Sequence, residues 1–313
     1  MMKTLNRKLI IKSLLLIPIT LIIQSNTGYG RLSSQKLKEE SWKFPQKDTL
    51  CIETLGSTKV FISGSNSGQI EIKLQYMAKP EEQFEINENQ TSVILKENIL
   101  NYDNQKPTKT YFQKWTWIIN VPDGTYIKCL GGSSDFEVTD FNGFFKADYG
   151  FGNFIFDNVD GSIDMLLAQL YAQIYNSKGS FRLSSAGGSI RATGLTITGN
   201  SSFSTGMGII KISLARPPES DLYVGSSFNR AQVRFNGHPV TGYFEFIAMA
   251  EEGRIISPFK FDKEEIFMDD IKNYRNASDF GKKSEHKRNS FIRGDSKPKI
   301  TLKTVTGIAQ LIK

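Results

Sequence analysis

A glycine recurs every nine residues through the centre of the chain, and this spacing constrains the fold more than any other feature. The residues on this frame are Gly143, Gly152, Gly161, Gly179 and Gly188, with Leu170 in the one gap. In every unit the second and fourth residues after the frame position are apolar, and the first and third are mostly polar. Alternation with period two is typical of a half-buried strand. Because glycine permits a sharp bend, we predict one short strand and one corner in each unit.

Two such units make a coil of about 18 residues. After Gly188 the frame slips by two residues to Gly199 and resumes at Gly208, and a slip of two leaves the inward and outward faces unchanged. Stacked coils would pair every strand edge and bury a continuous row of Phe, Ile and Leu side chains. The predicted fold class is all-β, with a right-handed β-solenoid or β-roll-like stack over residues 126–260. Among the aromatic residues, Phe144 and Tyr171 fall on outward positions where they could stack on a sugar ring.

Different patterns flank the repeats. Residues 31–125 contain five strand-like segments separated by turn residues, which predicts an N-terminal β-sandwich or an opening sheet. Residues 261–299 break the pattern with mixed charge and few periodic apolar residues, and we predict a charged insertion or a mobile loop there. Residues 300–313 are predicted to form the closing strands.

The first thirty residues have the order of a secretory signal peptide. Four basic residues and no acid come first, an apolar run from Leu14 to Ile23 follows, and Gly28 and Gly30 could mark a cleavage site. The apolar run is shorter than the roughly 20 residues of a membrane-spanning helix, so we expect no transmembrane span in the mature chain. An uncleaved N-terminal anchor is the alternative. Removal of residues 1–30 lowers the formal net charge from +7 to +3, and nucleic acid is not an expected partner.

The chain contains two cysteines, Cys51 and Cys129. An even pair in an exported protein could form one disulfide, and two buried thiols on separate strands are the alternative. One pair at this separation cannot form a zinc site. The repeats also lack the Gly-Gly-x-Gly-x-Asp pattern of a calcium-binding roll, so we predict neither a metal nor a cofactor.

Several short segments carry a resemblance to a known family. They are Trp117-Ile-Ile-Asn-Val-Pro-Asp-Gly, Asp140-Phe-Asn-Gly, Asn158-Val-Asp-Gly-Ser-Ile, Ser185-Ala-Gly-Gly-Ser-Ile and Thr304-Val-Thr-Gly-Ile. Together they resemble the adhesin-like β-strand-repeat family, a group of bacterial envelope domains of unknown function related to auto-transporter adhesin head domains. The resemblance covers roughly residues 45–250 and the last strands. It implies a β-solenoid in the envelope and an adhesive role, and it supplies no catalytic residues.

The favoured function is an exported, non-enzymatic, adhesin-like binding protein in the periplasm, at the outer membrane or outside the cell. Its partner would be an envelope glycan, a lipid headgroup or a protein. The candidate contacts to an anionic ligand are the clustered basic residues Lys282, Lys283, Lys287, Arg288 and Arg293. A solvated loop is the alternative interpretation of this cluster.

Two other functions stay open. One is an envelope scaffold or signalling partner that binds a membrane protein. The other is a β-helix enzyme acting on polysaccharides, for which Asp157, Asp160 and Asp164 would be the carboxylates. The Asn158-Val-Asp-Gly segment is also an ordinary turn, and His238 and His286 lie apart from any triad pattern. We therefore predict no catalytic residues.

Overall fold

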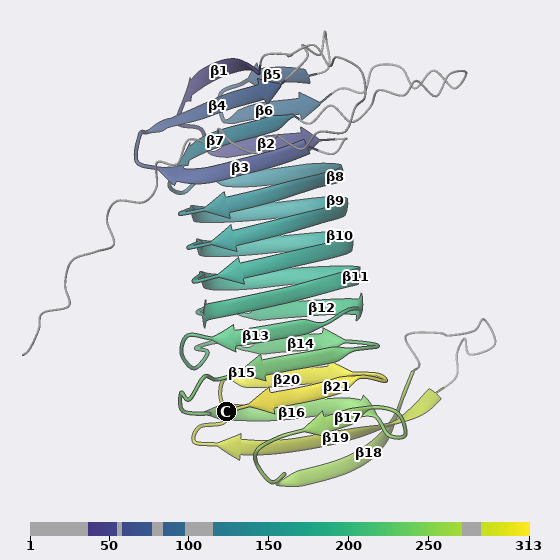
Figure 1. Ribbon diagram of the computed structural model, residues 1–313. Coiled ribbons are helices and arrows are strands. Elements are labelled where there is room, and N and C mark those ends of the chain that lie inside the picture. The colour runs from purple at the N-terminus through teal and green to yellow at the C-terminus, as the bar shows by residue number, and fades with distance from the viewer. Residues whose placement is uncertain (1–36, 55–57, 77–83, 98–114, 271–282) are drawn as a thin grey trace, which may run out of the picture. The chain divides into compact units, whose positions relative to one another are not determined.

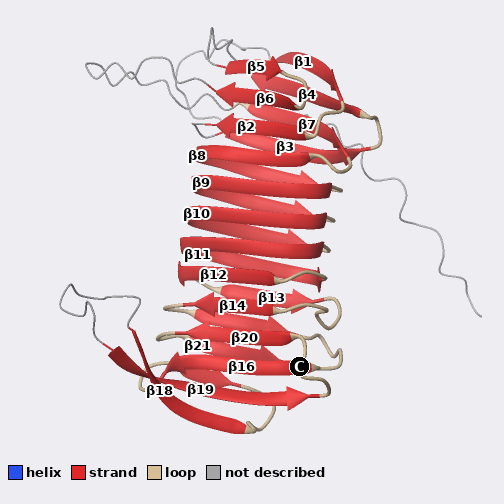
Figure 2. Cartoon of the chain, turned by 180° about the vertical axis from the view of Figure 1, so that it is seen from behind, coloured by secondary structure: helices blue, strands red, loops and turns tan. Residues whose placement is uncertain are grey.

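The computed structural model describes residues 37–54, 58–76, 84–97, 115–270 and 283–313. Every regular element in these ranges is a β-strand, numbered β1 to β21 along the chain (Figures 1 and 2). The all-β prediction is therefore confirmed. The described residues all belong to one compact unit. The predicted signal peptide, residues 1–30, lies outside the described residues.

The glycine repeats form a stack of long parallel strands. These are β8 (Tyr126–Thr139), β9 (Asn142–Asp157), β10 (Asp160–Tyr175) and β11 (Lys178–Ile197). Their register aligns Gly161 with Gly143 on one side and with Gly179 on the other. Each of β9, β10 and β11 contains two nine-residue units, so the chain bends within one continuous strand. This stack and the strands that extend it below are called the column (Figure 1).

Shorter strands extend the column beyond β11. They are β12 (Ser201–Met207), β13 (Ile210–Leu214), β14 (Leu222–Ser226), β15 (Arg230–Arg234), β20 (Lys299–Thr304) and β21 (Ile308–Ile312). All of them pair in parallel, and β12 and β13 both pair with β11. In one row β14 pairs with β12 and β20 pairs with β14. In the other row β15 pairs with β13 and β21 pairs with β15. The register aligns Leu183 with Phe203, so the two-residue slip preserves the inward face as predicted.

The last two strands do not close the column. On the far side of β20 and β21 lie β16 (Gly242–Met249) and β17 (Arg254–Ile256), each paired in parallel with one of them. Both edges of β20 are therefore hydrogen-bonded, to β14 and to β16. The prediction of closing strands is wrong in this respect, because the C-terminal strands form an internal layer.

The N-terminal strands belong to the same sheet. They are β1 (Lys38–Pro45), β2 (Thr49–Thr54), β3 (Thr58–Ser65), β4 (Gln69–Tyr76), β5 (Phe84–Glu88), β6 (Ser92–Glu97) and β7 (Thr116–Pro122). Strands β2 and β3 both pair in parallel with β8, β6 pairs with β2, and β7 pairs with β3. These N-terminal strands therefore continue the sheet of the column.

Residues 261–299 contain a strand pair. Strand β18 (Lys263–Asp270) is antiparallel to β19 (Lys283–Arg293), which is antiparallel to β16 (Figure 1). The mobile-loop prediction is wrong for these two strands, because their backbones are held in the sheet. The pair lies between β17 and β20 in the sequence, and an insertion there stays a prediction.

The core consists of the inward residues of every layer. The phenylalanines at its centre are Phe136, Phe145, Phe154, Phe156, Phe181 and Phe203, all buried. The rings of Phe136 and Phe154, aligned on adjacent strands, are stacked with centroids 5.0 Å apart. Burial of a side chain of this size contributes roughly 1.5–3 kcal/mol, so the aromatic stripe stabilises the column layer by layer.

Candidate functional site

One corner of the column is built from Asp and Asn residues in the left-handed backbone region. Asp140, Asn158 and Asn176 have φ angles of 50°, 55° and 48°. Asn and Asp tolerate this conformation better than other non-glycine residues. Asn158 Nδ2 donates a hydrogen bond to Asp140 Oδ1 at 2.6 Å, and Asn176 Nδ2 donates to Asp157 Oδ1 at 3.1 Å. The corner is therefore fixed by its own side chains.

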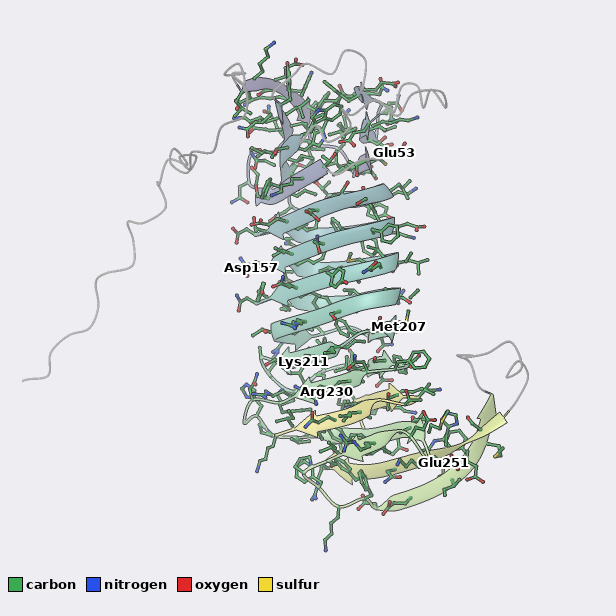
Figure 3. All side chains as sticks on the ribbon, turned by 45° about the vertical axis from the view of Figure 1, so that its right-hand side comes forward. Glu53, Asp157, Met207, Lys211, Arg230 and Glu251 are labelled. Atoms are coloured by element: carbon green, nitrogen blue, oxygen red, sulfur yellow. The ribbon has the colours of Figure 1, made fainter. Side chains whose placement is uncertain are left out.

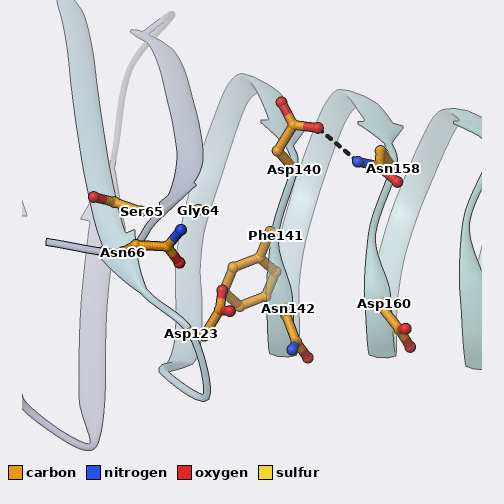
Figure 4. Close-up of a pocket in the computed structure, with 9 residues that line it drawn as sticks. All are labelled: Gly64, Ser65, Asn66, Asp123, Asp140, Phe141, Asn142, Asn158 and Asp160. Carbon is orange, nitrogen blue, oxygen red and sulfur yellow. Dashed lines mark hydrogen bonds between the residues drawn. The ribbon is translucent and has the colours of Figure 1, made fainter. Parts of the chain in front are cut away.

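A pocket of about 310 Å³ opens where this corner meets the end of β3 (Figure 4). Its lining comes from three turns of the column and from the β3–β4 turn: Gly64, Ser65, Asn66, Asp123, Asp140, Phe141, Asn142, Asn158 and Asp160. Phe141 is buried, whereas Asp123, Asn142 and Asp160 are exposed. At Gly64 an added Cβ would lie 2.0 Å from the Asp140 carbonyl oxygen, so only glycine allows β3 to approach this corner.

The pocket is rich in hydrogen-bond acceptors. It is lined by three carboxylates, of Asp123, Asp140 and Asp160, and by the side-chain amides of asparagine residues. Lys178 Nζ lies 3.1 Å from Asp160 Oδ2 and neutralises one carboxylate at the rim. Carboxylate and amide oxygens accept hydrogen bonds from hydroxyl groups, so the arrangement suits a ligand with many hydroxyls. No group of three His, Cys, Asp or Glu side chains in the described ranges could hold a metal ion.

Arg288, one of the predicted anion contacts, interacts with other side chains of the protein. Its Nη1 lies 2.9 Å from Glu265 Oε1, its Nε lies 3.6 Å from Glu245 Oε1, and its guanidinium group stands over the Phe267 ring at 4.4 Å. Hydrogen bonds from Lys263 and Arg288 lower the pKa of the Glu265 carboxyl. Arg288 thus joins β18 and β19 to β16.

Two of the other predicted basic contacts also interact within the protein. Lys287 Nζ donates to the Ala250 carbonyl oxygen at 3.4 Å, and the Arg293 guanidinium lies 4.6 Å from the centre of the Phe259 ring. Lys282 lies outside the described residues, and only the backbone of Lys283 is described. Contact of these residues with an anionic ligand stays a prediction.

The three carboxylates considered for catalysis occupy structural positions or the outer surface. Asp157 accepts the hydrogen bond from Asn176, and Asp160 pairs with Lys178. Asp164 lies on the outer face of β10, aligned with Arg182 of β11. Figure 3 shows Asp157 at the surface of the column. The two predicted outward aromatics, Phe144 and Tyr171, are exposed as expected.

The two cysteines are free thiols on adjacent strands. Register aligns Ile52 of β2 with Cys129 of β8, and Cys51 with Lys128. Cys129 therefore faces the core, where burial raises the pKa of its thiol, while Cys51 lies on the opposite face. A disulfide would need one side chain to change faces, so the structure favours the alternative of two thiols.

Sequence reasoning missed the pocket at the β3 end. The signal for the corner is present, because Asp140, Asn158 and Asn176 each precede a glycine by three residues and recur at 18-residue steps. The contribution of Gly64, Ser65 and Asn66 has no such signal, since it depends on the pairing of β3 with β8.

No known protein family matches the chain, and no curated protein matches it. Structural comparison aligns it with a "putative cell adhesion protein" of Clostridium sporogenes, at 13% identity and a TM-score of 0.30, over 88% of this chain and 99% of the other. A "putative adhesin" of Bacteroides fragilis aligns at 13% identity and 0.30, over 64% and 89%. A "putative lipid binding protein" of Parabacteroides distasonis aligns at 7% identity and 0.33, over 65% and 91%. Likeness at these TM-scores carries no argument about function.

Among the described residues, no helix has the length and apolar character needed to cross a membrane.

Proposed function

We propose that this chain is an exported, non-enzymatic surface protein of the bacterial envelope, adhesin-like, which presents a right-handed β-solenoid of about 18 residues a coil to a glycan, lipid or protein. One observation carries the proposal: parallel pairing aligns equivalent outward side chains in rows that run from strand to strand. Lys128, Lys146, Asp164 and Arg182, for example, occupy one register position on four successive strands. The offset between Gly143, Gly161 and Gly179 supports the coil length.

A rigid array of outward residues favours binding to an extended ligand. Parallel strands lie roughly 4.8 Å apart, so equivalent side chains repeat at that distance along the column. Because the backbone is hydrogen-bonded on both edges, little conformational freedom is lost when a ligand binds, which favours affinity. The acceptor-rich pocket at the Asp140 corner gives such a ligand a specific point of attachment, and its chemistry favours a hydroxyl-rich glycan.

A protein partner is the second candidate. Among the described strands, the only register pairing of β18 is with β19. On its surface Ile266 is 67% exposed and Met268 is 56% exposed. An exposed strand edge beside apolar side chains is a site where another chain can add a strand.

The test is binding of the labelled full chain to intact cells and to isolated envelope glycans. We expect saturable binding that is weakened about tenfold by Asp123→Asn, because this carboxylate lines the pocket. Asp148→Asn is the matched control, since Asp148 is exposed on β9 outside the pocket. Absence of saturable binding to every envelope fraction would refute the proposed function.

A further inference from the structure

A tyrosine ring lies flat on the surface of the column at β14. Tyr223 and Gly225 are two residues apart on this strand, so they share its outer face. A Cβ added at Gly225 would lie 2.5 Å from the Tyr223 hydroxyl oxygen and 2.8 Å from two ring carbons. The ring therefore covers the position where a side chain would stand. One part of the ring packs on the backbone of Gly225, and the residue as a whole is half-buried.

This ring forms part of a second pocket, of about 240 Å³, shared by four strands. Its polar lining comes from Arg182 on β11, Asn200 and Ser202 at β12, Asp221 before β14 and Lys299 at the start of β20. The strands β11, β12, β14 and β20 follow one another down the column (Figure 1). The pocket is thus built into consecutive layers and does not depend on a loose loop.

The charges in this second pocket are differently arranged from those at the Asp140 corner. Arg182 aligns with Asp164 on β10, yet no ion pair involving Arg182 is found among the described residues. By contrast, Lys299 Nζ lies 3.0 Å from Glu245 Oε2. The guanidinium of Arg182 is therefore the cation of the pocket that is available to a ligand.

The remaining polar groups suit hydroxyls. The backbone N–H of Lys299 donates to Asp221 Oδ1 at 2.8 Å, which fixes the carboxylate and leaves Oδ2 as an acceptor. Asn200 is exposed at the pocket and offers both a donor and an acceptor. The Tyr223 phenol is neutral at physiological pH because the ordinary pKa of tyrosine is about 10, and burial raises this pKa further.

We propose that this pocket binds a carboxylated sugar unit of an acidic polysaccharide. The carboxylate would be held by Arg182, whose planar guanidinium group matches the two carboxylate oxygens. The apolar face of the sugar ring would lie on Tyr223, and its hydroxyls would bond to Asp221 and Asn200. The proposal rests on the proposed function and gives the ligand its chemical class.

A phosphate headgroup fits this pocket less well. A phosphatidylglycerol headgroup carries one negative charge on its phosphodiester, as a sugar carboxylate does, so charge does not separate the two ligands. Its glycerol group lacks the ring face that would lie against Tyr223. Shape therefore favours the acidic sugar.

The test is calorimetric titration of the full chain with tetragalacturonate and with its fully methyl-esterified form. The ester keeps the rings and hydroxyls but has no charge, so we expect it to bind at least tenfold more weakly. Arg182→Gln should weaken tetragalacturonate binding at least tenfold, since hydrogen bonds to charged groups are the stronger class. Arg191→Gln removes the same charge from an exposed position outside the pocket and should change affinity less than twofold.

A second pair of variants tests the ring. Tyr223→Phe should bind within about threefold of the wild type, while Tyr223→Val should lose at least tenfold, with circular dichroism confirming that both fold. Equal binding of acid and ester, equal effects of the two arginine variants, or stronger binding to phosphatidylglycerol vesicles would overturn the proposal. If the chain binds envelope glycans but not tetragalacturonate, this inference fails and the proposed function stands. If it binds neither tetragalacturonate nor any envelope fraction, both fail.

Discussion

Replacement of Gly179 by alanine tests the stacking of the column directly. Gly179 has a φ of 142°, and an added Cβ would lie 1.6 Å from the carbonyl oxygen of Gly161 in the layer above. A side chain is therefore excluded twice, by the backbone conformation and by the neighbouring strand. The same contact recurs at Gly161, where the Cβ would meet the carbonyl oxygen of Gly143 at 2.0 Å.

The size of the effect follows from these two causes. A non-glycine residue at a sparsely populated positive φ costs about 1–3 kcal/mol. Relief of the clash must move β11 away from β10, which weakens one or two ladder hydrogen bonds worth roughly 0.5–1.5 kcal/mol each. The free energy of unfolding should fall by about 2–5 kcal/mol. At roughly 2–4 °C per kcal/mol for a large domain, the Tm should fall by about 4–20 °C.

Gly187→Ala is the matched control. Gly187 lies on the same strand, an added Cβ would find its nearest atom 3.8 Å away, and its φ is not in the positive region. Its Tm should stay within about 2 °C of the wild type in thermal melts followed by circular dichroism. Equal melting temperatures for the two variants would refute the stacking geometry.

Three further predictions concern local features. Asn158→Ala should lower the free energy of unfolding by about 1–2 kcal/mol, because alanine disfavours this φ and the bond to Asp140 is lost; unchanged chemical denaturation would contradict this. Alkylation followed by mass spectrometry should modify Cys51 before Cys129, because full burial raises the pKa of the Cys129 thiol and blocks access, whereas a Cys51–Cys129 crosslink in the purified protein would show the structure's free thiols to be wrong. Burial raises the pKa of the Tyr149 phenol above its value in the unfolded chain. The stabilising contribution of the neutral phenol is therefore lost as pH rises beyond the unfolded value of about 10. Between pH 8 and 11 the Tm should fall less steeply for Tyr149→Phe than for the wild type.

The central layers could be predicted because their signal is local. Glycine at nine-residue steps and strict alternation are readable in any window of the sequence, and both follow from the geometry of a short strand and a corner. The same reasoning identified the inward phenylalanines and the outward Phe144 and Tyr171, which the structure confirms.

Strands β18 and β19 were harder to predict because apolar and polar residues do not alternate along them. Strand β18 reads Lys-Glu-Glu-Ile-Phe-Met-Asp-Asp, and its neighbour β19 buries His286, Asn289 and Ser290. Asn289 Nδ2 donates to Glu264 Oε2 at 2.9 Å. Polar pairs of this kind replace apolar contacts at the end of the core. The many charged residues of this segment therefore led to the wrong prediction of a loop.

The binding pockets depend on long-range pairing that sequence alone does not reveal. Asn66 and Asp140 meet because β3 pairs with β8. Likewise Lys299 reaches the Tyr223 pocket because β20 inserts beside β14. Nothing in the residues of β20 distinguishes an internal layer from a closing one, since both need an apolar inward face.

We propose that the chain binds an envelope polysaccharide without altering it. The direct measurement is to incubate the full chain with isotope-labelled envelope glycans, determine the bound fraction at equilibrium, and then analyse the recovered glycan by mass spectrometry. We expect saturable binding and a glycan recovered with its original length and mass. Shortened or unsaturated products would show an enzyme, and no bound fraction at any concentration would contradict the binding role itself.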